Sequence, residues 1–448
     1  MDFLKDAALP QSLEHFHLIV LIAALNALVF VPYLTFVLGS SLLSYLFDRK
    51  GRKSSDEKYR KFSKLLIDLP LYSKTVVTFL GIIPGLALVL IYAQMLQSTG
   101  AMSVGLAGFG FLSLVIAFVL LYSYKYTFRL EGILENVNVD KANEEVEEYR
   151  RSNSSVHLRS GKWGLFFLIV AVFLYAAAMS ITTNPSGWND AGSFFDVVFS
   201  NDVWLKFLIL LILSVGITGV SIIYFGIAYH GLKMEIDEKV KSLVHQTGKQ
   251  LIVFSMIVLP LVILLNVIML PLDVMSGMIY LLAGLTISFL FIAAHSYYGY
   301  FKEKKTSTIG YGMFMFLCAI ALLIVNDYVV IANATKEHAA VLSARYDKVT
   351  EEMKTKLGIT MVSMTGEDIY NAKCSACHLF NQKKVGPPYN ETIPKYNGDK
   401  AKIIEFVMNP VKKNPAYPPM PSQGLKPAEA DSIVSYIMSK VAGNSQQK

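Results

Sequence analysis

The sequence has few cysteines and little charge. Only 3 of its 448 residues are cysteine, which is too few for a disulfide framework. Charged residues make up 17% of the chain and hydrophobic residues 53%, whereas a soluble domain is about a quarter charged. This balance excludes disordered and collagen-like classes, and we expect no nucleic acid partner. It is typical of a polytopic membrane protein.

Long apolar runs predict the membrane-spanning helices. A helix needs about 20 apolar residues to cross roughly 30 Å of hydrocarbon. Eight runs reach this length and have cores nearly free of charge: 17–46, 76–97, 104–128, 163–183, 203–229, 251–271, 274–297 and 310–334. We therefore predict an all-α protein with an eight-span bundle in residues 1–334. Residues 335–362 are expected to form a helical linker or stalk, and residues 363–448 a small water-soluble domain.

The basic residues between the runs predict an orientation. Lysine and arginine number 9, 6, 4 and 3 in four alternate segments, 48–75, 129–162, 230–250 and 298–309. The intervening segments 98–103, 184–202 and 272–273 carry none. Because basic loops stay in the cytoplasm, we expect the N-terminus outside. Eight crossings then return the C-terminal domain to the outer side.

The two halves of the bundle share a pattern. At an offset of 173 residues the end of the third run matches the end of the seventh, and two further matches lie at nearby offsets. The matched pairs are Phe118 and Phe291, Ser123 and Ser296, Tyr124 and Tyr297, Phe128 and Phe301, Arg129 and Lys302, Gly39 and Gly219, and Pro84 and Pro260. We interpret this as a tandem repeat of two four-helix units in parallel orientation. Chance similarity between apolar helices with aromatic ends is the alternative.

A short motif in the water-soluble domain carries the chemistry. Cys374, Cys377 and His378 form C-x-x-C-H, the attachment sequence of haem c. Two thiols at this spacing can add to both vinyl groups of one haem, and the adjacent imidazole then becomes the proximal ligand of the iron. A zinc site would need a second ligand pair, and residues 363–448 contain no further Cys or His. A disulfide-exchange site would need a thioredoxin-like sheet, for which the flanking sequence offers no strands.

The flanks of this motif resemble class I cytochrome c from Thr365 to Val441. Four segments resemble, in order, the N-terminal helix, the haem-edge loop, the middle helix and the C-terminal helix of that family: Gly366–Tyr370, Gly386–Pro388, Ala401–Asn409 and Ala428–Ser439. The resemblance implies a small all-α domain with one covalently bound haem c.

The same resemblance implies Met420 as the sixth ligand of the iron. It lies in the segment Tyr417–Gly424, where prolines on both sides stiffen the chain. A thioether opposite an imidazole raises the reduction potential. The other methionines of this region are alternatives: Met408 and Met438 have the spacing of helix core residues, and Met361 and Met364 precede the first helix.

Together these features predict electron transfer. An iron with two protein ligands has no open position for a substrate, so it carries single electrons. Haem attachment to this motif takes place on the outer side of bacterial inner membranes, where the charge count independently places the domain. We therefore expect an inner-membrane, multi-pass protein with a periplasmic cytochrome c domain. The expected partners are lipid and other membrane and cytochrome subunits of a respiratory or photosynthetic complex.

The membrane domain also resembles subunit I of cytochrome bd oxidases. The shared features are an outside N-terminus, His15 and His17 at the mouth of the first run, paired four-helix units and a basic loop after the first run. The resemblance implies His17 or His15 as a haem ligand. Two departures argue against oxygen reduction: only about two residues separate the sixth and seventh runs, and no run core contains glutamate.

A b-type haem in the bundle would need two facing imidazoles. His230 and His295 both lie at cytoplasmic ends of runs and form the conceivable pair, whereas His17 lies at the outer end. The alternative is that both are interfacial or hydrogen-bonded histidines. We assign His157, His245 and His338 to loops or to the linker and attach no functional hypothesis to them.

Asp327 is an ionisable residue in the outer third of the last run, where such a group needs a partner or water. It is a candidate for accepting or relaying a proton during quinol oxidation; the alternative is a polar residue bonded to Asn326 or to a neighbouring helix. Three functions stay open: an electron-transfer subunit that takes electrons from quinol or partner cofactors, a haem-free scaffold that tethers the cytochrome, and a quinol-oxidising enzyme with its own b haem or quinone site.

Overall fold

The computed structural model describes residues 8–135, 144–188, 194–229, 237–357, 365–415 and 417–445. Every regular element in these ranges is a helix and none is a strand, which confirms the all-α prediction. The chain divides into two compact units, Met1–Tyr346 and Asp347–Lys448. The division falls inside α13 (Lys336–Lys356), within the segment predicted as a linker. Each unit is described by itself.

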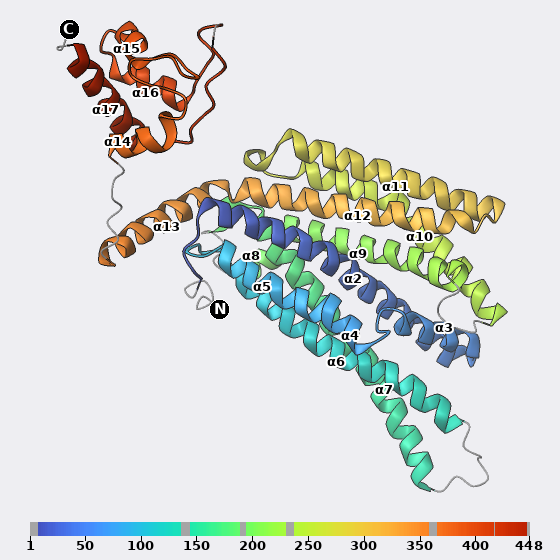
Figure 1. The fold of residues 1–448 in the computed structure, drawn as a ribbon. Coiled ribbons are helices and arrows are strands. Elements are labelled where there is room, and N and C mark those ends of the chain that lie inside the picture. The colour runs from blue at the N-terminus through green and yellow to red at the C-terminus, as the bar shows by residue number, and fades with distance from the viewer. Residues whose placement is uncertain are drawn as a thin grey trace. The chain divides into compact units, whose positions relative to one another are not determined.

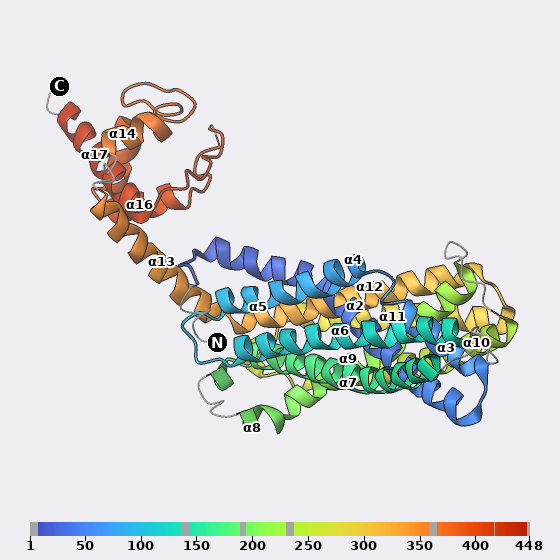
Figure 2. The ribbon, with the colours of Figure 1, turned by 90° about the horizontal axis from the view of Figure 1, so that it is seen from below.

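In the described part of unit 1, eight helices are long and apolar enough to cross a membrane, and they coincide with the eight predicted runs. The chain therefore has the character of a multi-pass membrane protein. The spans are α2 (Leu13–Ser54), α4–η1–α5 (Lys74–Val77, Thr78–Ile82 and Ile83–Met95), α6 (Ser103–Glu135), α7 (Glu144–Thr182), α9–η4 (Asn201–Ile223 and Tyr224–Ala228), α10 (Glu238–Ile268), α11 (Gly277–Glu303) and α12 (Ser307–Ala334). Figures 1 and 2 show these long helices side by side.

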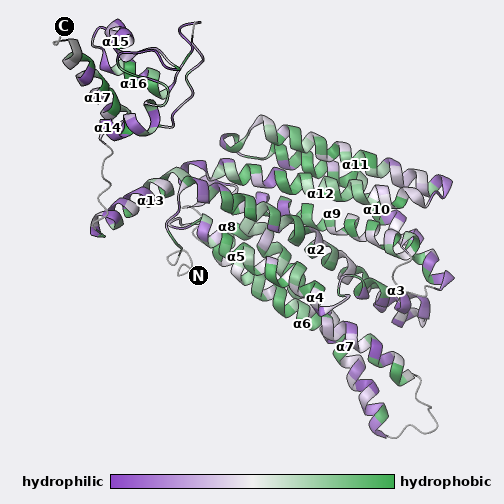
Figure 3. Ribbon diagram, in the orientation of Figure 1, coloured by the Kyte–Doolittle hydropathy of each residue, from purple (hydrophilic) through white to green (hydrophobic). Residues whose placement is uncertain are grey.

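Short elements connect the spans. They are α3 (Glu57–Asp68), η3 (Pro185–Trp188), α8 (Phe194–Val198) and η5 (Leu272–Val274). Figure 3 shows hydrophobic residues along the long helices and hydrophilic residues on α3 and on the end of the α6–α7 hairpin. This distribution is the one expected of a bundle whose middle lies in lipid.

The helix neighbours follow the predicted repeat. Span 3 packs on span 4 (α6 on α7) as span 7 packs on span 8 (α11 on α12). Span 4 contacts span 5 (α7 on α9) as span 8 contacts span 1 (α12 on α2). The first spans of the two halves, α2 and α9, contact each other directly. This is the neighbour pattern of two similar four-helix units related by an axis along the bundle.

Matching tyrosines pack on matching glycines in the two halves. A Cβ atom on Gly161 of α7 would lie 2.7 Å from the Tyr124 ring, and one on Gly312 of α12 would lie 2.8 Å from the Tyr297 ring. Both tyrosines are 1% exposed. Each glycine thus lets an aromatic ring lie directly against a helix backbone, so the paired residues of the sequence repeat occupy equivalent places.

His157 and His245, which the sequence places in loops, lie on helices instead, and that assignment was wrong. His338 lies on a helix within the segment 335–362 that was predicted as a helical linker. His157 belongs to α7, His245 to α10 and His338 to α13. The reason is that α7 is 39 residues long, about 58 Å at 1.5 Å per residue. It therefore continues well beyond the roughly 30 Å of hydrocarbon, and its polar first half has the composition of a loop.

Unit 2 is a small helical domain. Its elements are α14 (Gly366–Ile369), the π-turn η6 (Tyr370–Cys374), α15 (Tyr389–Thr392), η7 (Ile393–Tyr396), α16 (Lys400–Met408) and α17 (Pro427–Ser445). Its core gathers apolar side chains from the first helix, α16 and α17, including Ile369, Ile403, Ile433 and Val434.

Candidate haem site

The C-x-x-C-H segment closes on itself as a turn after the first helix of unit 2. The Cys374 carbonyl accepts hydrogen bonds from the backbone N–H groups of Cys377 (3.1 Å) and His378 (2.9 Å). The Tyr370 hydroxyl donates to the His378 carbonyl over 3.1 Å. These bonds hold both thiols and the imidazole on one short stretch of backbone, which the predicted attachment chemistry requires.

The His378 ring is oriented by the loop that follows it. Its Nδ1 lies 2.9 Å from the Pro387 carbonyl oxygen. Because a carbonyl can only accept, Nδ1 carries the proton and donates, and the lone pair is on Nε2. Nε2 is therefore the nitrogen available to an iron. A backbone partner of this kind fixes both tautomer and ring direction in ligand histidines.

Gly386 leaves the room that this ring needs. A Cβ atom at this position would lie 2.2 Å from Cε1 of His378, far inside van der Waals contact. The Gly386 N–H also donates to the Cys377 carbonyl over 2.8 Å, so the loop folds back onto the motif. The segment Gly386–Pro388, predicted as a haem-edge loop, thus packs against the His378 ring.

The first and last helices of unit 2 cross in close contact. A Cβ atom on Gly366 of α14 would lie 2.4 Å from the Ser432 carbonyl oxygen and from Tyr436 Cβ on α17. The Thr365 hydroxyl and the Asp368 carboxylate form a capping box at the start of α14, and this hydrogen bonding keeps the pKa of Asp368 below its ordinary value. The crossing fixes the helix that leads into the haem motif.

The loop that carries Met420 is tied to the motif segment on both sides of that residue. Lys373 Nζ donates to the Gln423 carbonyl over 3.3 Å. The Lys383 ammonium lies 4.8 Å from the centroid of the Tyr417 ring, a cation–π contact. Met420 itself is partly buried. Its role as sixth ligand stays a prediction, and these two contacts support it because they bring the loop to the motif.

The residues present fit a covalently attached haem. Cys374 and Cys377 are both free thiols, and burial raises the pKa of Cys374 while the Tyr389 hydroxyl bonded to it opposes that shift. Burial also raises the pKa of Tyr389 well above its ordinary value, so this phenol stays neutral. Within the described residues, no group of three or more His, Cys, Asp and Glu side chains is placed to hold a metal ion.

Comparisons with known proteins agree with this geometry. The family model described as cytochrome c matches residues 363–440. Cytochrome c-552 of Hydrogenobacter thermophilus is 32% identical over 88 residues, which are 18% of this chain and 89% of that protein. Cytochrome c-551 of Pseudomonas denitrificans is 36% identical over 78 residues, 16% of this chain and 95% of that protein. Cytochrome c-551 of Azotobacter vinelandii is 33% identical over 79 residues.

Unit 2 is thus a domain of the class that holds one haem by two thioether bonds and two axial ligands. Through residues 363–440 the chain belongs to the cytochrome c family. It is accordingly a protein with a covalently bound haem c, an electron-transfer domain and an apolar helical bundle of transmembrane character.

The described candidate residues of the membrane unit lie on three helices, α2, α11 and α12. His15 and His17 are exposed near the start of α2, and His15 contacts the Tyr346 ring edge-on with centroids 6.3 Å apart. His295 is exposed on α11. His230 lies outside the described residues, so the predicted His230–His295 pair is not placed.

Asp327 has a partner that the sequence did not suggest. Its carboxylate forms an ion pair with Lys206 of α9, whose side chain is only 7% exposed. Lys206 was overlooked because a single lysine within the apolar run 203–229 leaves the mean hydropathy high. The pair joins α9 to α12, the first and last spans of the second half.

A second buried acid–base pair joins the first and last spans of the first half. His157 Nε2 lies 3.2 Å from Asp48 Oδ2, and these side chains are 0% and 1% exposed. The other ring nitrogen, Nδ1, lies 2.6 Å from the Thr127 hydroxyl, and Arg52 Nε donates to Asp48 over 3.0 Å. Only the spacing of polar residues along a long helix could have suggested this cluster, and the sequence interpretation had treated that stretch as a loop.

Proposed function

We propose that this protein is a membrane-bound monohaem c-type cytochrome that acts as an electron-transfer subunit of a respiratory or photosynthetic complex. It exchanges electrons between membrane quinol or partner cofactors and periplasmic redox partners. The observation that carries the proposal is the hydrogen bond from His378 Nδ1 to the Pro387 carbonyl inside a closed C-x-x-C-H turn, because it presents Nε2 as an iron ligand.

Each residue of the site has a defined task in this proposal. Cys374 and Cys377 would hold the haem covalently, and His378 and Met420 would ligate its iron, which would leave no ligand position for a substrate. Gly386 and Pro387 fix the direction of the His378 ring. When bound, haem c supplies one-electron chemistry.

The proposed location is the bacterial inner membrane with unit 2 in the periplasm. The count of basic residues in alternate loops supports this orientation, as does the outer-side maturation expected for haem c. The likeness of the membrane unit to subunit I of bd oxidases belongs to the same proposal. It is supported by the paired four-helix units, and it extends to the arrangement of spans and not to oxygen reduction.

The second candidate function is a haem-free membrane scaffold that tethers the cytochrome domain. The histidines of unit 1 favour it over a quinol-oxidising enzyme with a b haem. Both ring nitrogens of the buried His157 are engaged, with Asp48 and Thr127, and His17 and His295 lie near opposite ends of their spans. Asp327 is engaged with Lys206, which supports a structural role for that carboxylate.

One measurement separates the electron-transfer subunit and the scaffold from the quinol-oxidising enzyme. The full chain is expressed in cells that mature haem c and purified in detergent, and a pyridine haemochrome spectrum is recorded together with the intact mass. We expect only c-type absorbance and a mass increased by one haem. Added b-type absorbance would favour the quinol-oxidising enzyme, and an unmodified polypeptide mass would refute the cytochrome proposal altogether.

A further inference from the structure

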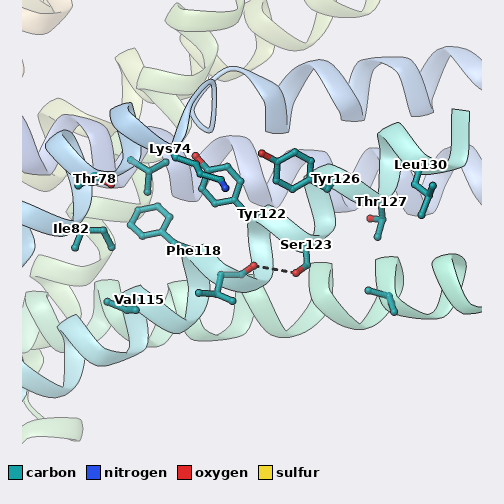
Figure 4. A pocket seen from close by; sticks show the side chains of 13 residues that line it. Lys74, Thr78, Ile82, Val115, Phe118, Tyr122, Ser123, Tyr126, Thr127 and Leu130 are labelled. Atoms are coloured by element: carbon teal, nitrogen blue, oxygen red, sulfur yellow. Dashed lines mark hydrogen bonds between the residues drawn. The ribbon is translucent and has the colours of Figure 1, made fainter. Parts of the chain in front are cut away.

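A groove of about 770 Å³ opens on the side of the membrane unit. It lies between the second span, α6 and α7, and Figure 4 shows its lining residues. Most of them are apolar or aromatic, among them Ile82, Phe118 and Val119. Val119 is 62% exposed in the middle of an apolar helix, so this wall of the groove faces hydrocarbon when the bundle lies in a membrane.

The groove results from a local widening of the second span. Residues Thr78–Ile82 form a π-turn between α4 and α5, and such turns bulge a helix. Gly81 faces Phe118 so closely that a Cβ atom would lie 2.9 Å from its ring. Tyr33 stacks behind Phe118 with ring centroids 6.4 Å apart. The bulge therefore abuts α6 at one point and leaves the groove open beside it.

The groove is lined by a lysine and a tyrosine hydroxyl that lack partners of their own within the ranges that the structure describes, Lys74 and Tyr122. Lys74 is exposed at the start of α4, at the end of the lysine- and arginine-rich segment 48–75. The Tyr122 hydroxyl is buried and has no hydrogen-bond partner among the described residues. The neighbouring Lys125 is already engaged, because its ammonium donates to the Leu71 carbonyl over 2.5 Å and lies 3.4 Å from Asp68. Among the described residues that line the groove, Lys74 is thus the cation with which a ligand can pair.

We propose that this groove is a binding site for one anionic phospholipid. The acyl chains lie along Val115, Phe118 and Val119, the phosphate pairs with the Lys74 ammonium, and the Tyr122 hydroxyl donates to a headgroup or ester oxygen. Charge complementarity selects this occupant, because the cation lies at the end of the bundle with the basic loops, where anionic headgroups are attracted. A quinone has a neutral headgroup and would leave the Lys74 charge without a counter-ion.

The proposal is tested on the full chain by native mass spectrometry. The protein is purified in detergent, stripped of lipid, and titrated with dioleoyl phosphatidylglycerol or with dioleoyl phosphatidylcholine. We expect one phosphatidylglycerol to be retained at a concentration at least tenfold lower than phosphatidylcholine. Lys74→Glu removes this selectivity, and Val119→Trp, which fills the groove, lowers retention of both lipids. Lys239→Glu, at an exposed site on α10, changes charge equally and retains the wild-type selectivity.

Three results would overturn the proposal. They are unchanged phosphatidylglycerol retention in Lys74→Glu, equal retention of the two lipids by the wild type, and a quinone that competes with phosphatidylglycerol for the same position. Lys74 is exposed, so its replacement leaves folding intact, and haem content and thermal unfolding verify this for each variant. If Val119→Trp fails to fold, Lys74→Gln gives the second test, with a smaller loss of selectivity expected.

Discussion

At the scale of single residues, the haem site depends on groups that hold a ligand rather than on the ligands alone. His378 is directed by a carbonyl at Pro387 and by the absence of a side chain at Gly386. The C-x-x-C-H motif identified the two cysteines and the histidine, because attachment of a haem to two thiols requires this spacing. The resemblance to cytochrome c placed Gly386 and Pro387 in a haem-edge loop, but it did not give their contacts with the His378 ring, because these arise only when the loop folds back on the motif.

Replacing Met420 tests the other axial position. We expect Met420→Ala to abolish the near-infrared sulfur-to-iron band and to lower the reduction potential, since the thioether raises it. The haem stays covalently attached, because both thioether bonds remain. Near-infrared absorbance and intact mass measure the two effects. Met438→Ala, on α17, is the matched control, and a band that survives in Met420→Ala would assign the ligand to Met408, Met438 or another sulfur.

The buried pair Lys206–Asp327 makes a second prediction at this scale. Removing one partner leaves an uncompensated charge in a low-dielectric site, which typically costs about 3–5 kcal/mol. We therefore expect Lys206→Met and Asp327→Leu each to lower the thermal stability in detergent, and the double variant to recover much of that loss. A double variant no more stable than either single one would contradict the pairing.

If the stable double variant also loses quinol-dependent reduction of the haem, Asp327 acts as a proton relay as well.

At the scale of helices, the predicted repeat is supported by two equivalent contacts, that of Tyr124 with Gly161 and that of Tyr297 with Gly312. The sequence revealed the tyrosines, since they align at one offset. It did not reveal the glycines, because their spacing differs between the halves and nothing in a single sequence links a glycine to a ring on another helix. The apolar lengths of the spans were predictable because hydrocarbon thickness sets them. The polar half of α7 was not, because helix–helix packing rather than composition keeps it helical.

The two glycines should respond alike to substitution. Gly161→Ala and Gly312→Ala each place a methyl group within 3 Å of a buried ring, and overpacking of this kind costs about 1–3 kcal/mol. We expect both to lower the midpoint of thermal unfolding. Gly284→Ala on α11 has open space around its Cβ position and should leave the midpoint unchanged or raise it. A large effect in only one half would argue against equivalent packing.

The start of α13 should respond to pH through His338. Burial lowers the pKa of this imidazole below its ordinary value of 6.5, while backbone groups of Gln97 and Met95 oppose the shift. Its ring packs edge-on against Trp188 with centroids 5.6 Å apart. The folded state therefore prefers the neutral ring, and stability present above pH 6.5 is lost as the pH falls through the lowered pKa. The protection factors for hydrogen exchange of residues 336–346, which correct for the pH dependence of intrinsic exchange, should fall as the pH is lowered from 7.5 to 5.5, and His338→Phe should remove that fall.

At the scale of the whole molecule, one fold combines a hydrophobic eight-helix unit with a water-soluble cytochrome unit, and the number of spans decides which compartment the haem meets. An even number returns the chain to the side on which it began. The basic segments lie in alternate connections, so each of these loops separately predicts the same orientation. If the chain had one span more or one fewer than predicted, unit 2 would lie on the opposite side of the membrane, where haem c is not matured.

Reporter fusions test that parity directly. Alkaline phosphatase, which is active only in an oxidising compartment, is fused after Lys64 in the first basic segment or after Gly100 in the first segment without basic residues. We expect activity only in the Gly100 fusion, because the positive charge around Lys64 holds that loop in the cytoplasm. A cytoplasmic reporter such as green fluorescent protein should give the inverse pattern. Activity in the Lys64 fusion would place the basic loops outside and unit 2 in the cytoplasm, and the proposed exchange with periplasmic partners would then fail.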